Sequence, residues 1–176
     1  IRNSWSNQAP LIEAVDVLRV RAESKDRVGP WTLAELGRFD PPQLENRTDW
    51  KLTASHGQDK IRGAIDGSPR SRWDTGSVQR PGMWFTIELP EAVRISDLTL
   101  DARGSNDDYP RGYLVHISDD GKAWGDPIAE GRGVHALTRI ELSTANRTQH
   151  IRVTQTGSSP NKYWSIHELG IKGLTG

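Results

Sequence analysis

Short apolar segments separated by turn residues run through the chain from Trp50 onward, and this pattern limits the possible folds most strongly. The turns recur at intervals of about 8–12 residues, which is typical of an all-β sandwich. Phe85, Ile87 and Leu89 occupy every second position, so their side chains share one face of a strand. The same period marks residues 113–118. Further strands are predicted at 95–100, 137–142, 151–156 and 166–171. The sequence therefore predicts an all-β fold of roughly eight antiparallel strands.

One hairpin turn is predicted at Asp119-Asp120-Gly121, because Asp-Gly tolerates the positive φ angles that a tight turn needs. Trp124 follows three residues after Gly121. We therefore expect Trp124 on the returning arm of this hairpin.

The first 40 or so residues differ from the rest, because their apolar residues fit neither the helical nor the strand period. Residues 33–36 predict one short helical turn that ends at Gly37. Pro41-Pro42 then marks a boundary. We therefore divide the chain into an N-terminal extension at 1–43, with a strand and a short helical turn, and a β-sandwich at 44–176. The extension can belong to a preceding domain.

The charge balance disfavours several classes of partner. Lys plus Arg and Asp plus Glu number 23 each, so no net field steers the chain toward nucleic acid or an anionic membrane. No apolar run approaches the roughly 20 residues of a membrane span. Cysteine is absent, which excludes disulfides and thiolate metal sites. The chain opens at Ile1 without a signal sequence, so we expect a mature or excised segment.

Catalytic motifs are missing from the sequence. The five histidines have no zinc-binding spacing, and neither a nucleophile elbow nor a phosphate loop is present. Adjacent acids such as Asp107 and Asp108 lie in a glycine-bearing turn, where they are more often loop residues than a glycosidase pair. We therefore predict that the chain is not an enzyme.

Four motifs follow one another in a fixed order at residues 64–73 (AIDGSPRSRW), 81–89, 109–124 and 164–169. Their order resembles that of discoidin domains, also called coagulation factor 5/8 type C domains, a superfamily that includes the family 32 carbohydrate-binding modules. The resemblance covers roughly residues 48–173. It implies a discoidin-like, galactose-binding-like jelly-roll β-sandwich and a non-catalytic carbohydrate-binding function.

The resemblance also implies one structural calcium ion as cofactor. Its ligands would be the Asp66 carboxylate, the Ser68 carbonyl, the Ser71 hydroxyl and Glu168 from the last strand, with carbonyls near 61–63. Calcium takes six to eight oxygen ligands of these kinds. In the alternative interpretation, Asp66-Gly67 is an ordinary turn and Glu168 an exposed strand residue, and a sodium ion is a further alternative.

The resemblance places the sugar-binding site at one end of the sandwich. In relatives that bind sugars, a histidine follows the signature tryptophan, an arginine follows the fourth strand, and an aromatic residue near the C-terminus stacks on the ring. These places hold Asp74, Arg103 and Trp164. Asp74 departs from the pattern, and an ionised carboxylate cannot donate a hydrogen bond. The family's common preference for galactose-like sugars is therefore not carried over to this chain.

Two polar loops, 104–109 and 158–163, are expected to lie beside this site. Their candidate sugar contacts are Asn106, Asp108, Tyr109 and Tyr163. Each has a structural alternative, since a solvated turn can carry the same residues. Arg103 can instead pair with Asp74 or Asp101, and Trp73, Trp84 and Trp124 are expected to pack in the core or a hairpin.

The main hypothesis is a secreted, periplasmic or cell-surface module that anchors a larger protein to a polysaccharide or other glycan. The first alternative is an adhesion module for protein or phospholipid, because one fold serves several functions. The second is a structural domain that packs against a parent catalytic domain and binds nothing itself.

Overall fold

The computed structural model describes residues 40–142 and 147–175. The short helical turn predicted at 33–37 and the strand of the extension lie outside the described residues. Pro41–Gly176 forms one compact unit. Within the described ranges, no helix is long and apolar enough to cross a membrane.

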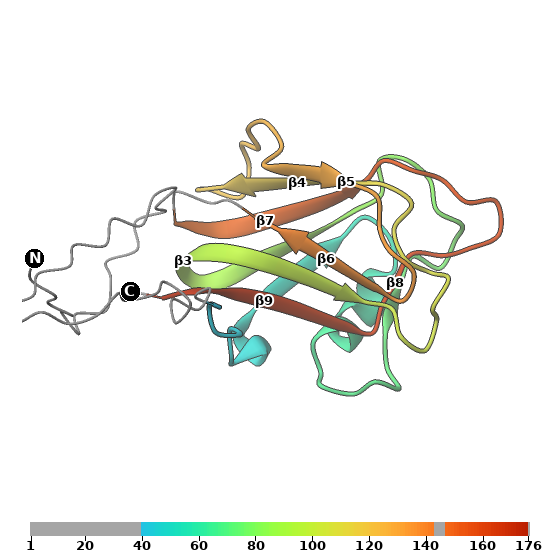
Figure 1. The fold of residues 1–176 in the computed structure, drawn as a ribbon, viewed down its shortest axis with the longest axis horizontal. Coiled ribbons are helices and arrows are strands. Elements are labelled where there is room, and N and C mark those ends of the chain that lie inside the picture. The colour runs from blue at the N-terminus through green and yellow to red at the C-terminus, as the bar shows by residue number, and fades with distance from the viewer. Residues whose placement is uncertain (1–39, 143–146, 176) are drawn as a thin grey trace, which may run out of the picture. The chain divides into compact units, whose positions relative to one another are not determined.

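The described residues form an antiparallel β-sandwich, which confirms the predicted fold class (Figure 1). Its strands are β1 (Lys51–Ala54), β2 (Trp73–Asp74), β3 (Trp84–Asp101), β4 (Tyr113–Ser118), β5 (Ala129–Gly131), β6 (Leu137–Glu141), β7 (Thr148–Gln155), β8 (Ser165–Ile166) and β9 (Glu168–Leu174). Two short 3-10 helices, η2 (Arg47–Asp49) and η3 (Gln58–Ala64), flank β1.

The long strand β3 belongs to both layers of the sandwich. Its first half pairs with β1 and β7, and the register shifts between Glu88 and Val93. Its second half, from Arg94 to Asp101, pairs with β9 and β6. The two layers are therefore β1-β3-β7-β4-β5 and β6-β3-β9, joined by one continuous strand. A separate two-residue ladder, β2 with β8, lies beside them.

The core follows the alternation that the sequence predicts. Phe85, Ile87 and Leu89 are all buried, whereas their neighbours in the chain are half-exposed or exposed. An aromatic cluster fills the core near β2 and β8, with Trp73 and Trp164 ring centroids 5.1 Å apart and Phe85 and Trp164 centroids 5.3 Å apart. This cluster joins the two-residue ladder to the main sheet.

The predicted turn is present, but it opens a long connection rather than a tight hairpin, and the partner strand starts later than expected. Gly121 has a φ of 70°, and amides of Lys122 and Ala123 donate to the Asp120 carboxylate at 2.8 and 2.9 Å. These backbone bonds lower the pKa of Asp120 to about 2. The placement of Trp124 on the returning strand is wrong, because β5 begins only at Ala129. Trp124 lies in the connection, and its ring packs 4.6 Å from the Arg152 guanidinium.

Candidate functional site

The loops of residues 75–82, 102–112, 132–136 and 156–164 gather at one end of the sandwich, at the right in Figure 1. We call these four loops the loop end. They are joined by contacts between loops: Lys162 binds Asp107 at 2.8 Å, and the Ala136 amide donates to the Asn106 carbonyl at 3.0 Å. His135 approaches the same Asp107 carboxylate at 3.7 Å. The two polar loops predicted from the sequence therefore lie side by side.

A pair of buried glutamines, Gln79 and Gln155, fixes the arrangement of the loop end. The Gln79 side chain donates to the carbonyl of Tyr109 at 3.0 Å and to that of Tyr163 at 2.6 Å. Its oxygen accepts from the Arg111 amide at 3.1 Å and from the Gln155 side chain. Both amides are buried. One buried group thus positions two of the predicted sugar contacts, Tyr109 and Tyr163.

Sequence reasoning missed this pair. One signal was present at Gln155, which continues the inward positions of β7 after Ile151 and Val153 and so places an amide in the core. Gln79 lies in a loop that has no such period, so the chain offers no comparable signal there.

Asp74 lies in β2 beneath two cations. Its carboxylate accepts from Lys60 Nζ at 3.1 Å, from Arg72 Nε at 3.1 Å and from the Gly76 amide at 2.9 Å. Burial alone raises the pKa of Asp74, but the bonds from Lys60 and Arg72 outweigh it and hold the pKa below the ordinary value. Only 5% of Asp74 is exposed. The prediction of a direct sugar contact through Asp74 is therefore corrected: the carboxylate positions Lys60 and Arg72 instead.

The stacking role predicted for Trp164 is wrong. Its exposed fraction is 0%, and its ring packs in the core against Trp73 and Phe85. The chain enters β8 at this point, so Trp164 faces inward while its neighbour Tyr163 stays outside. Tyr163 is 39% exposed and is the exposed aromatic ring of the loop end.

Arg103 forms the ion pair with Asp101 that the sequence offered as its alternative role. Its Nε lies 2.9 and 2.8 Å from the two Asp101 oxygens, and its Nη2 binds the same carboxylate. Burial raises the pKa of Asp101, whereas the bonds from Arg103 lower it to a net value below the ordinary one. Arg103 remains 68% exposed.

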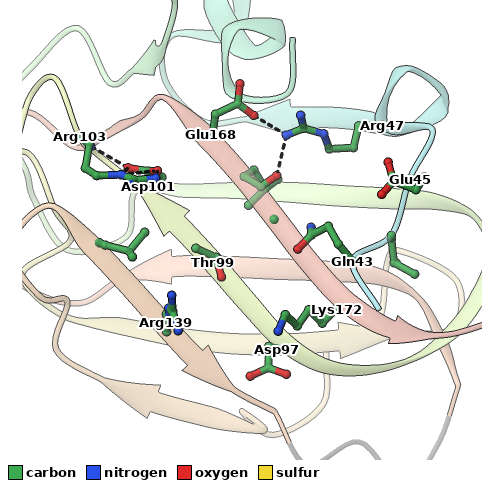
Figure 2. A pocket seen from close by; sticks show the side chains of 14 residues that line it. Gln43, Glu45, Arg47, Asp97, Thr99, Asp101, Arg103, Arg139, Glu168 and Lys172 are labelled. Atoms are coloured by element: carbon green, nitrogen blue, oxygen red, sulfur yellow. Dashed lines mark hydrogen bonds and ion pairs between the residues drawn. The ribbon is translucent and has the colours of Figure 1, made fainter. Parts of the chain in front are cut away.

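The Arg103–Asp101 pair lies at one end of a groove on the outer face of β6-β3-β9 (Figure 2). The groove has a volume of about 530 Å³ and carries charges of both signs, with Thr99 and Arg139 between its ends. Arg103 thus lines this groove while it is bound to Asp101.

The remaining predicted contacts lie in the 102–112 loop. Asn106 is exposed, and its side-chain oxygen accepts from the Gly104 amide at 3.2 Å. Asp108 accepts from the Ser165 hydroxyl at 2.8 Å. Tyr109 lies under the Arg111 guanidinium, which is 3.8 Å from the ring centre. The structure thus brings these three residues to the same end as Tyr163.

Three of the four predicted calcium ligands, Asp66, Ser68 and Ser71, lie together in one turn, whereas Glu168 is paired with Arg47. Ser71 Oγ lies 2.6 Å from Asp66 Oδ2 and 3.1 Å from the Ser68 carbonyl, so three candidate ligand oxygens converge. Glu168 pairs with Arg47 through one oxygen, and its other oxygen is buried without a partner among the described residues. Uncompensated buried oxygens and clustered oxygens fit an ion of this type. No group of three or more acids, histidines or cysteines is found in the ranges described, so hydroxyl and carbonyl oxygens would have to complete the shell.

Arg47 was not anticipated at this site. Its Nη1 donates to Glu168 and, at 3.2 Å, to the Leu169 carbonyl. Its Nη2 lies 3.8 Å from the position of a Cβ on Gly67. Arg47 therefore ties the segment before β1 to the start of β9, and its guanidinium lies near the Gly67 turn. Nothing in the spacing of the sequence points to this contact, which spans more than a hundred residues.

These features define a discoidin-type jelly-roll module with a polar loop end. The family model of the F5/8 type C domain matches residues 47–169 of the chain. The chain belongs to this family.

Solved structures with the same fold include several family 32 carbohydrate-binding modules. The module CpGH89CBM32-5 from Clostridium perfringens, solved with GalNAc-β-1,3-galactose, has a TM-score of 0.61 and 21% identity, and the match covers 74% of this chain and 99% of that one. The module of C. perfringens NanJ, solved with galactose, has a TM-score of 0.60 and 21% identity, and the match covers 71% of this chain and 94% of that one. The AlyQ module, solved with 4,5-unsaturated mannuronic acid, has a TM-score of 0.56 and 22% identity, and the match covers 76% of this chain and 98% of that one. At these identities the similarity establishes the fold.

Among curated proteins, the chain is similar to a galactose oxidase from Gibberella zeae, with 24% identity over 138 residues. The match covers 72% of this chain and 20% of that protein. The chain thus spans about a fifth of the length of this relative.

Proposed function

We propose that the loop end binds carbohydrate and that the chain is a non-catalytic carbohydrate-binding module. The observation that carries the proposal is the exposed ring of Tyr163 beside polar side chains that can pair with hydroxyl groups. Gln79 ties the Tyr163 backbone to that of Tyr109, and Lys162 ties the same loop to Asp107. The apolar ring and the polar groups are thus held as one surface.

A sugar ring has an apolar face and a rim of hydroxyl groups, so one flat aromatic ring with a few hydrogen-bonding groups suits its recognition. Tyr163 can supply the stacking surface. Asn106 lies exposed in the neighbouring loop and can pair with hydroxyls. The similar folds solved with sugars support this assignment. Few contacts are available, so we expect weak affinity for a single sugar unit.

We further propose that the module keeps a larger secreted or cell-surface protein close to its glycan. The similarity to one fifth of a galactose oxidase supports a role as one segment of a longer protein.

The test is a glycan-array screen of the purified chain, followed by calorimetry on each hit for the wild type, Tyr163→Ala and a control. Lys51→Ala is a suitable control, because Lys51 is exposed on β1 and pairs with Glu88 rather than with any loop-end residue. We expect Tyr163→Ala to weaken binding at least about tenfold, since stacking on an aromatic ring contributes ~1–3 kcal/mol. No binding to any glycan would reject the proposal in favour of a protein-adhesion role or a packing role.

We also propose that Asp66, Ser68, Ser71 and Glu168 hold a structural calcium ion. Calcium bound only by the folded chain would stabilise it by RT ln(1 + [Ca]/Kd), so the melting temperature would rise with the logarithm of the calcium concentration once that exceeds Kd. We expect millimolar calcium to stabilise the wild type and to leave Asp66→Ala unaffected. Asp119→Ala, an exposed turn aspartate, should keep the calcium response of the wild type. An unchanged melting temperature of the wild type with calcium or a chelator would reject the ion.

A further inference from the structure

We infer that the loop end selects an acidic sugar, a hexuronic acid, over its neutral counterpart. The inference rests on the proposed carbohydrate-binding function and assigns it a ligand class. It comes from the charges around Asp74, where one carboxylate is bound by two cations, Lys60 and Arg72. This trio borders the loop end, since Asp74 binds the Gly76 amide of the 75–82 loop and Arg72 binds Ser105 of the 102–112 loop.

The exposure of these three side chains differs sharply. Only 7% of the Asp74 side chain is exposed, against 49% for Lys60 and 37% for Arg72. A ligand that approaches from solvent therefore meets the ammonium and guanidinium groups, and the carboxylate lies beneath them. Two positive charges face one negative charge, so one positive charge is left uncompensated within this trio.

Both cations keep hydrogen-bond donors for a ligand. Arg72 uses Nε on Asp74 and Nη1 on Ser105, and its Nη2 makes no hydrogen bond to the residues that the structure describes. Lys60 has three N–H groups, of which one binds Asp74. These free donors flank the same carboxylate, so a second carboxylate can engage both groups at once.

The nearby charges do not cancel this excess. The exposed Asp107 is bound by Lys162, and the buried Asp101 is bound by Arg103. Asp108 remains as an acid in the same region, where it accepts from Ser165, and Arg111 adds a cation beside Tyr109. Ser105 joins Arg72 to the buried His167, whose other ring nitrogen lies 3.0 Å from the Pro69 carbonyl. Arg72 is thus held in place by neighbours on two sides.

A carboxylate that receives N–H bonds from Lys60 and Arg72 forms hydrogen bonds in which donor and acceptor are both ionised, so attraction between opposite charges adds to each bond. A hydroxymethyl group in the same place accepts from the same cations as a neutral group and lacks this attraction. We therefore expect a preference of about tenfold for the acid, because one such bond differs by roughly 1–2 kcal/mol between the two ligands.

The experiment compares matched pairs of sugars that differ only at C6: galacturonic acid with galactose, glucuronic acid with glucose, and mannuronic acid with mannose. Affinity is measured by NMR titration of the full chain at about 20 mM and about 300 mM salt, concentrations between which surface charges become screened. We expect the acid of at least one pair to bind about tenfold more tightly at low salt, with a smaller preference at high salt.

Substitutions of lysine test which side chains bind the carboxylate of the sugar. Lys60→Gln should reduce the preference for the acid, Lys60→Arg should retain it, and Lys51→Gln, which removes an exposed lysine on β1, should leave it unchanged. Equal or better binding of the neutral sugars would overturn the inference while leaving the carbohydrate-binding function standing. Binding of neither member of any pair, together with an empty glycan array, would overturn both.

Discussion

Replacement of Gln79 by alanine tests how the loop end is held together. The side chain is 1% exposed and makes four hydrogen bonds, two as donor and two as acceptor. Its removal leaves the carbonyls of Tyr109 and Tyr163, the Arg111 amide and the Gln155 side chain without this partner. Each unsatisfied buried group costs about 1–3 kcal/mol, but water that enters the vacated space would replace some of the bonds.

We therefore expect Gln79→Ala to lower the free energy of unfolding by about 2–4 kcal/mol. Urea denaturation followed by tryptophan fluorescence measures this change, and an unchanged m-value would confirm that the fold is kept. Sugar affinity should fall as well, because Tyr109 and Tyr163 lose their common anchor.

Gln149→Ala is the matched control. Gln149 is partly buried and donates to the Leu89 carbonyl at 2.8 Å, away from the four loops. The Gln149→Ala substitution should lower the free energy of unfolding by less than about 1 kcal/mol and leave sugar affinity unchanged. If Gln79→Ala cost no more than this control, the buried amide would not be what fixes the loops.

Three further predictions follow from the same structure. Trp164→Ala should destabilise the fold by about 3–5 kcal/mol or abolish it, whereas Tyr163→Ala should cost less than about 1 kcal/mol; thermal unfolding of both variants would contradict this if the order were reversed. Asp74→Asn should lower the free energy of unfolding by about 1–3 kcal/mol, because Lys60 and Arg72 would then face each other across a neutral group. Added salt screens the repulsion between these two cations, so it should recover part of the lost stability. Burial and the neighbouring Arg152 lower the pKa of His116 below its ordinary value of 6.5 in the folded chain. The unfolded chain therefore binds this proton more readily, so the contribution of His116 to stability is full above pH 6.5 and is lost as the pH falls below 6.5. His116→Gln should flatten the slope of the unfolding free energy against pH below pH 6.5, and an unchanged slope would refute this.

Much of the fold can be predicted from the sequence because strand alternation is a local property. Phe85, Ile87 and Leu89 are buried as their spacing predicts, and the ranges predicted for the later strands fall within or across β3, β6, β7 and β9. The start of β5 could not be predicted in the same way. The 113–118 strand and its partner are joined by a long connection, so the Asp119-Asp120-Gly121 turn starts that connection rather than a tight hairpin.

The site was less predictable, because the orientation of a side chain depends on partners far away in sequence. Tyr163 and Trp164 are adjacent aromatic residues, and the register of β8 against β2 decides which of them faces inward. Residue types and spacing carry no information on that register. Arg47 binds Glu168 across the whole length of the sandwich sequence, and this contact arises only when the strands have paired. The Arg103–Asp101 pair is local by contrast, since two positions separate the residues, and it is one of the alternatives that the sequence offered.

If the loop end binds sugar as proposed, the ladder of β2 and β8 would let it change its ligand without loss of the fold. In β2 the core residue Trp73 is followed by Asp74, and at the entry to β8 the exposed Tyr163 precedes the core residue Trp164. The two tryptophan rings pack against each other, so the fold depends on them. Positions 74 and 163 lie one residue from the core on opposite sides of this contact. We expect a substitution at position 163 to change the exposed surface, and one at position 74 to change which cations are held above it, while the aromatic cluster that joins β2 and β8 to the main sheet keeps its packing. An aspartate at position 74 recruits Lys60 and Arg72, so a single residue beside the core decides which charge the loop end presents to solvent.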